Sequence, residues 1–411
     1  MTDINKKEQK ISLLFSIFII FHFIFAFFYQ ENAGGGKIDE IHILNNFNLF
    51  YNNNLFEIDW SKYDSTSLPF IYIFYNLIIN TNDYYQIIYL NLFISFVTFL
   101  FFYGSLLKVF NQQNKYNILL ISACIFLSPY FRTSTFFALE ENLAIFFTMV
   151  GFYLFFIYQN VKKIFILVFC FFFLALAVYS RSYYIIIYLL MLITCLDKTK
   201  FLTKKNILIS IFSFLLSLPV LYILFKWKGI VPPVASSRTQ IFSFYNNFPI
   251  IFNIILIYTL PFFLIEIKNI DKKVLVKKLL FFVFFFPFYY FFFHNIEINQ
   301  FGGGALNKLL FLFFSEQTIR SLTILISYFS ILILFVLFLN KFFIIGFVVF
   351  ACIVFSNLSV VFQEYFDPLT FIILLLFGDI SIFREKIYKY FLFVYFYLFL
   401  LSSIYYQYII V

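Results

Sequence analysis

Two adjacent acids follow the first long apolar run of the 411-residue chain. Asp39 and Glu40 stand in the stretch GGGKIDEIH, and His42 comes two residues after Glu40. A carboxylate at the edge of a membrane can take a proton from a hydroxyl group while a phosphate leaves, which is the work of a general base. Acids near the start of a helix also stabilise the helix dipole, so the pair has a purely structural interpretation as well.

Three arginines near the ends of apolar runs form a second group of candidates. They are Arg132 in SPYFRTS, Arg181 in YSRSYY and Arg238 in PPVASSRTQ. The planar guanidinium binds phosphate oxygens through paired hydrogen bonds. For most basic residues at a helix end, anchoring at the membrane interface is a sufficient explanation. Arg181 is the strongest candidate for a functional role, because it stands in a very short turn where a charge close to hydrocarbon is costly.

Further candidates lie late in the chain. His294 and Lys308 bracket the sequence HNIEINQFGGGALNK, whose three glycines predict a flexible turn. Successive backbone N–H groups in such a turn are able to bind an anion, but the pattern of a nucleotide-binding P-loop is absent. Glu364 lies in QEYFDP at the edge of another apolar run. We group these three residues with His42 and the three arginines as candidate substrate-binding residues.

The elements that must position these residues are membrane helices. Hydrophobic residues make up 63% of the chain and charged residues only 12%, whereas soluble domains carry about 25% charged residues. The mean hydropathy of +0.93 and the long apolar runs predict an all-α protein that crosses a membrane many times. This composition excludes a soluble enzyme, a nucleic-acid-binding protein and a disordered chain. The few cysteines and histidines show no metal-binding spacing.

The apolar runs predict the number of spans. We expect about 13 transmembrane helices, within a range of roughly 11–14, in a single integral membrane domain over residues 1–411. The runs lie at 11–29, 84–107, 116–131, 138–158, 164–180, 183–196, 206–225, 249–267, 279–293, 320–339, 342–360, 366–382 and 390–410.

The distribution of charge predicts the topology. With the N-terminus in the cytoplasm, most Lys and Arg fall in short inner loops and most Asp and Glu fall outside. The net charge of +9 is therefore a sign of topology and not of nucleic-acid binding. The longest outer loop is 31–83, called loop one below, and the next are 226–248 and 294–319. Apolar residues at helical spacing over 38–56, and a second short apolar stretch over 68–79, predict two helices on the membrane surface.

Several short motifs resemble one known superfamily. A first span followed closely by an acidic pair resembles the GT-C glycosyltransferases, and the chain is similar within it to the eukaryotic α-1,2-glucosyltransferases of N-glycan precursor synthesis. DEIH resembles that family's Asp-Glu-x-x-His motif with one residue fewer, and the segment 59–74 keeps Trp60 of its Trp-Asp-Pro segment. VYSRSYYI resembles its Arg-Gln-Thr-Asn stretch, with Arg181 at the Arg position. The stretch 229–240 resembles another of its loops but lacks the Asp and His, and QEYFDP lacks the Arg of its late element.

The resemblance implies an activity and roles for particular residues. It implies a GT-C-like fold and the transfer of a hexose, with inversion, from a polyprenyl-phosphate donor. The acceptor would be a lipid-linked glycan, a lipid or another surface molecule. Asp39 would be the base, with Glu40 as its neighbour, and Arg181 would bind the donor phosphate. We expect no cofactor, and a divalent ion held by carboxylates stays open.

Two other functions remain open. One is an O-antigen or capsule polymerase, although the main loop of such proteins tends to lie in the second half of the chain. The other is a transporter of lipid-linked glycans, which predicts internal repeats and charges at the bilayer midplane. The Lys-, Asn- and Ile-rich composition is typical of an AT-rich bacterial genome. We therefore expect a bacterial inner membrane protein with its active site facing outward.

Overall fold

All regular secondary structure in the described part of the protein is helical. The computed structural model describes residues 2–29, 32, 36–51, 58–65, 67–79, 83–110, 115–196, 203–229, 232, 244–298, 302–356, 358 and 360–378. Every regular element within them is a helix, which confirms the predicted all-α class. The sequence predicted one membrane domain, and the chain clusters into two compact units. Among the described residues, unit 1 comprises those up to 232 and unit 2 those from 244 onward.

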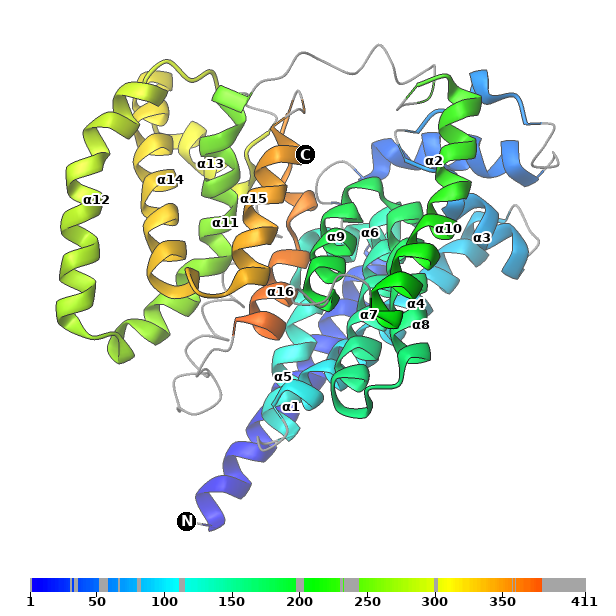
Figure 1. Ribbon diagram of the computed structural model, residues 1–411, viewed down its shortest axis with the longest axis horizontal. Coiled ribbons are helices and arrows are strands. Elements are labelled where there is room, and N and C mark those ends of the chain that lie inside the picture. Colours follow the sequence, from blue (N-terminus) through cyan, green and yellow to red (C-terminus); the bar gives the residue numbers. More distant parts are fainter. Residues whose placement is uncertain are drawn as a thin grey trace. The chain divides into compact units, whose positions relative to one another are not determined.

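Figure 1 shows the helices, coloured in chain order. Unit 1 contains α1 (Thr2–Phe28), α2 (Gly36–Tyr51), the 3₁₀ turn η1 (Trp60–Lys62), α3 (Phe70–Ile79), α4 (Tyr84–Val109), α5 (Lys115–Ala123), η2 (Cys124–Leu127), α6 (Pro129–Phe136), α7 (Glu140–Val161), α8 (Ile164–Ser180), η3 (Ser182–Tyr184), α9 (Ile185–Cys195) and α10 (Lys204–Trp227). Unit 2 contains α11 (Phe244–Glu266), η5 (Ile267–Asn269), α12 (Lys272–Phe293), α13 (Gly304–Phe313), α14 (Glu316–Phe338), α15 (Phe342–Phe355), η6 (Gln363–Tyr365) and α16 (Leu369–Phe377).

The helices are consistent with an integral membrane protein, but thirteen spans are not confirmed. Within the described residues, seven helices are long and apolar enough to cross a membrane, or eight if the bent pair α5–α6 forms one span. Crossing the hydrocarbon core takes about 20 helical residues. Four predicted spans form helices shorter than that, namely α8, α9, α15 and α16. The predicted span 390–410 lies outside the described residues.

One predicted span is broken. The run 116–131 continues to Phe136, but the helix bends by 65° between its two parts. Ser128 caps the second part by accepting a hydrogen bond from Phe131 N, and Pro129 occupies the first helical turn. Pro lacks an N–H group and suits the start of a helix, so a Ser-Pro pair begins a new helix instead of extending the old one.

A buried amide network supports the end of α6. The Asn91 Nδ2 atom donates to the backbone oxygens of Ser134 and Thr135, both at 2.8 Å. Asn142 Nδ2 donates in turn to Asn91 Oδ1 at 2.7 Å. The last carbonyl groups of a helix lack partners within the helix, and leaving them unpaired in an apolar core is costly. The network therefore fixes α6 against α4 and α7, which carry Asn91 and Asn142.

Loop one folds into two helices, as predicted. They are α2 and α3, which pack against each other in unit 1 (Figure 1). A Cβ atom on Gly36 would overlap the Thr133 side chain, so the start of α2 approaches α6 closely. The position of these helices on a membrane surface stays a prediction.

Unit 2 is built around α11 and α14. Figure 1 shows α14 between α11 and the outermost helix, α12. The hydroxyl of Tyr289 on α12 hydrogen-bonds with Ser327 Oγ at 2.8 Å, and Tyr328 OH donates to Phe282 O at 2.7 Å. These contacts and stacked aromatic rings tie α12 to the unit, while most of its large side chains are exposed. Such an apolar exposed surface is expected of a helix that faces lipid.

Candidate active site

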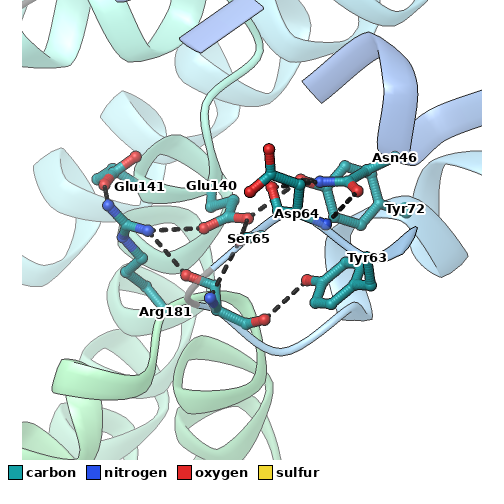
Figure 2. Close-up of polar contacts among 9 residues, drawn as sticks. Asn46, Tyr63, Asp64, Ser65, Tyr72, Glu140, Glu141 and Arg181 are labelled. Carbon is teal, nitrogen blue, oxygen red and sulfur yellow. Dashed lines mark hydrogen bonds and ion pairs between the residues drawn. The ribbon is translucent and has the colours of Figure 1, made fainter. Parts of the chain in front are cut away.

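Arg181 binds two adjacent carboxylates in unit 1. It follows the last residue of α8, and Glu140 and Glu141 open α7. Its Nη1 lies 2.8 Å from Glu140 Oε2, and its Nη2 lies 2.5 Å from Glu141 Oε1. The three side chains are largely buried, at 19%, 7% and 11% exposed respectively. One guanidinium therefore joins the ends of two helices through charge-assisted hydrogen bonds (Figure 2).

Loop one is attached to this ion cluster by hydroxyl groups. Arg181 Nη1 donates to Ser67 Oγ at 2.7 Å. Ser65 Oγ donates to Glu140 Oε1 at 2.9 Å, and Tyr72 OH donates to the same oxygen at 3.2 Å. Figure 2 shows these contacts converging on Glu140 from loop one and from the turn after α8. Because the partners are ionised, each bond is stronger than a neutral one.

The cluster contains one more acidic group than basic groups. One guanidinium faces two carboxylates, and both of these stand at a helix start, where the dipole favours negative charge. Burial raises the pKa of the Tyr63 and Tyr72 hydroxyls well above their ordinary value, and the Glu140 carboxylate adds to this effect. Both phenols therefore act as neutral hydrogen-bond donors, as Tyr63 does to Ser67 O at 2.7 Å.

A histidine–aspartate pair lies beside the ion cluster. His42 Nδ1 on α2 lies 2.7 Å from Asp64 Oδ2. Asn46, one turn after His42, accepts from Asp64 N at 3.1 Å and donates to Asp64 O at 3.0 Å. Asp64 immediately precedes Ser65 (Figure 2). Consecutive residues of loop one therefore bind His42 and the ion cluster.

Aromatic rings close the other side of loop one. The Tyr63 and Trp227 rings stack with centroids 6.0 Å apart, and Trp60 meets Trp227 edge-on at 6.3 Å. Trp227 ends α10 and is 5% exposed. Pairs of this geometry add stability beyond the area that they bury. They join loop one to the end of α10.

The predicted acid pair lies on the first turns of α2. Asp39 is exposed and Glu40 is half-buried, with the Tyr84 hydroxyl next to the Glu40 carboxylate. Asp39 precedes His42 by three residues, which places the two on one side of the helix. The structure thus brings Asp39 to within one turn of the His42–Asp64 pair.

Arg132 belongs to a different environment. It is fully buried in α6, and its Nη1 lies 3.0 Å from His22 Nε2 of α1. Its neighbour Thr133 is the residue that the start of α2 approaches. The burial and the contact with His22 make Arg132 part of the packing between α1 and α6.

The remaining predicted residues do not belong to the described part of unit 1. Arg238 lies outside the described residues. In unit 2, His294 is exposed and its Nδ1 lies 2.7 Å from Phe291 O. Lys308 lies near Glu364; burial lowers the pKa of the Lys308 ammonium, and the Glu364 carboxylate opposes this shift.

The glycine turn before Lys308 is held by protein groups. Gly303 N donates to Val361 O at 2.8 Å, and Ala305 N donates to Gln363 Oε1 at 2.8 Å. Two amides of the turn are therefore already satisfied, which counts against the anion-binding role that the glycines suggested. In the described part of the chain, no group of three His, Cys, Asp or Glu side chains is arranged to hold a metal ion.

Sequence reasoning did not select all residues of this site. Glu140, Glu141 and Asp64 were not among the candidates, nor were Ser65, Ser67 and Tyr72. An acidic pair at the very start of an apolar run was a usable signal for Glu140 and Glu141, because such acids need a cation nearby if they are buried.

Comparison with known proteins finds no matching family model, no similar curated protein and no similar solved structure.

Proposed function

We propose that the protein is a membrane glycosyltransferase. It moves a hexose from a polyprenyl-phosphate donor to a lipid-linked glycan, a lipid or another surface acceptor. The reaction takes place on the outer face of a bacterial inner membrane, with the N-terminus in the cytoplasm. The proposal combines the resemblance to GT-C enzymes with the polar site of unit 1.

One observation carries this proposal. Loop one is folded and attached by side chains to the ends of apolar helices, and there it brings Arg181, two glutamates and the His42–Asp64 pair together. A substrate with a long apolar tail and a charged sugar-phosphate head needs a site of this kind. Such sites place a few convergent polar groups beside an apolar wall.

Arg181 serves the donor phosphate in this proposal. Both of its terminal nitrogens are paired with carboxylates. Phosphate oxygens take the place of one carboxylate when the donor binds, and the displaced glutamate takes up a proton so that no unpaired charge stays buried. The planar guanidinium of arginine binds the oxygens of phosphate and of carboxylate in the same geometry, so the exchange preserves the arrangement of the hydrogen bonds. As the bond to the sugar breaks, the guanidinium stabilises the negative charge that develops on the phosphate.

A group on α2 accepts the proton of the attacking hydroxyl. The family resemblance implies Asp39 for this role, with Glu40 beside it. The other predicted substrate-binding residues stay predictions, namely His42, Arg132, Arg238, His294, Lys308 and Glu364.

The test is sugar transfer by the purified protein in liposomes. The vesicles contain polyprenyl-phosphate hexoses labelled in the sugar, together with a lipid extract that supplies acceptors. We expect label to move to an acceptor while free polyprenyl phosphate appears in equal amount. Arg181→Lys keeps the positive charge but removes the planar guanidinium and its paired N–H donors. We expect this variant to lower turnover roughly 10²–10³-fold.

Arg320→Lys is the matched control. Arg320 also pairs with a glutamate, Glu316, but in unit 2 and at an exposed position, so turnover should stay close to that of the unmodified protein. If no donor yields transfer, the proposal is wrong. Movement of the intact donor across the bilayer without sugar transfer would favour a transporter.

A further inference from the structure

The His42–Asp64 pair has the arrangement of a general base and the residue that orients it. Nδ1 of His42 lies 2.7 Å from Asp64 Oδ2. A carboxylate at this position accepts a hydrogen bond from Nδ1–H, and this fixes the tautomer of the neutral ring. The lone pair then resides on Nε2, the nitrogen that takes up a proton in catalytic His–Asp pairs.

Asp64 is held more firmly than a surface contact requires. Asn46 binds both the N–H and the C=O group of Asp64, at 3.1 and 3.0 Å. Asn46 is 1% exposed, and its Nδ2 also lies 3.2 Å from Tyr72 OH. The backbone of Asp64 is thus fixed to the same helix that carries His42. A base works best when the residues around it keep its orientation.

Access distinguishes His42 from the nearby glutamates. The side chain of His42 is 43% exposed, whereas Glu140 and Glu141 are 7% and 11% exposed and both bind Arg181. The oxygens of both glutamates are bound to the guanidinium or to hydroxyl groups of loop one and expose little surface, so an acceptor hydroxyl has poor access to them. The imidazole is therefore the more available base beside the ion cluster.

We infer that His42 is the catalytic base of the proposed sugar transfer and that Asp64 is its positioning residue. The inference rests on the proposed function and replaces Asp39 as the base. The acceptor oxygen attacks the anomeric carbon, and its proton passes to His42 Nε2. The bond between that carbon and the phosphate oxygen breaks, and its electron pair leaves with polyprenyl phosphate. His42 then releases the proton to water.

The test uses imidazole to restore a missing side chain. His42→Ala in the full-length protein should lower turnover roughly 10²–10⁴-fold. Added imidazole should restore a measurable part of it, since the position is accessible. Asp64→Asn should lower kcat while leaving KM nearly unchanged, because it favours the other tautomer. Imidazole should not restore that variant.

Two variants on the same helix serve as comparisons. Asn45→Ala alters an exposed residue of α2 and should leave turnover unchanged. Asp39→Asn should reduce turnover much less than His42→Ala does. Thermal unfolding in detergent verifies that each variant is folded.

Two outcomes would overturn the inference while the proposed function stands. In the first, the unmodified protein transfers sugar and His42→Ala does so equally well. In the second, folded His42→Ala is inactive and imidazole restores nothing, which marks a structural role. If the unmodified protein transfers no sugar from any donor, the proposed function fails and the base assignment fails with it.

Discussion

Loop one of unit 1 and the glycine turn of unit 2 are both polar segments fixed to their helices, but by different means. Arg181 and Glu140 hold loop one through ionised groups, at 2.7 and 2.9 Å from Ser67 and Ser65. The glycine turn, residues 302–305, is held by neutral groups, including Ala305 N on Gln363 Oε1 at 2.8 Å. Its geometry depends on Gly303 and Gly304, which have φ of +82° and +72°.

The difference shows where each unit is vulnerable. Removing one member of a buried ion cluster leaves an uncompensated charge, which costs far more than the lost contact. Removing a neutral hydrogen bond costs less, and replacing both partners by apolar groups is close to neutral. We therefore expect charge to govern the stability of loop one and backbone conformation to govern that of the glycine turn.

The largest effect should come from Arg181→Ala. This change leaves Glu140 and Glu141 buried without their cation, and we expect it to lower the free energy of unfolding by about 3–5 kcal/mol. The matched change Arg320→Ala removes an ion pair with Glu316 whose side chains are 36% and 63% exposed. That pair should be worth less than about 0.5 kcal/mol. Thermal unfolding in detergent compares the two, and equal losses would contradict the contrast.

A smaller effect should come from Gly303→Ala. Its φ of +82° is unfavourable for a residue with a Cβ atom, and that atom would overlap the Asn307 side chain. We expect the backbone alone to cost about 1–2 kcal/mol. Gly104→Ala near the end of α4 is the control. Its Cβ atom would lie 3.0 Å from the Tyr153 ring, but the backbone there is helical and favours alanine, so we expect stability to change by less than about 1 kcal/mol. A loss at Gly104 as large as that at Gly303 would mean that backbone conformation is not the cause.

The smallest effect should come from a pair of buried amides in unit 2. Asn253 and Asn307 are both fully buried, and Asn253 Nδ2 donates to Asn307 Oδ1 at 3.4 Å. Within the described residues, the other two amide atoms, Asn253 Oδ1 and Asn307 Nδ2, have no hydrogen-bond partner. Changing both to Leu should alter stability by less than about 1 kcal/mol.

Asn46→Leu in unit 1 provides the contrast to that double variant. It removes two bonds to the backbone of Asp64 and one to Tyr72, and we expect it to cost roughly 1–3 kcal/mol. Circular dichroism melting curves recorded in one detergent give both values. A loss from the double Leu variant that exceeds the loss from Asn46→Leu would reverse the expected order.

Much of the fold was predictable because lipid restricts the choices. Long apolar runs such as those of α4 and α14 must form helices, since no other open structure satisfies the backbone in hydrocarbon. The bend after α5 was also present in the sequence, as a Ser-Pro pair that starts a helix. The length of the shorter helices was not predictable. An apolar run shows which residues avoid water, but it does not show where a helix begins or ends.

The site was predictable only in part. Arg181 was selected for its short turn, and the structure confirms that it lies between α8 and η3. Its partner Glu140 stands 41 residues earlier, and Ser65 reaches Glu140 across 75 residues. No local period links residues so far apart; only the packing of α7 beside α8 brings them together. The role of Asp64 was hidden for the same reason, since it depends on the register of α2 against loop one.

The meeting of Trp60 and Trp227 has a practical consequence. The chain contains only two tryptophans, and their ring centroids are 6.3 Å apart. Nearly all indole emission from the protein therefore originates at one spot, where loop one touches the end of α10. The tryptophan fluorescence spectrum of the unlabelled protein therefore reports on any opening of that contact.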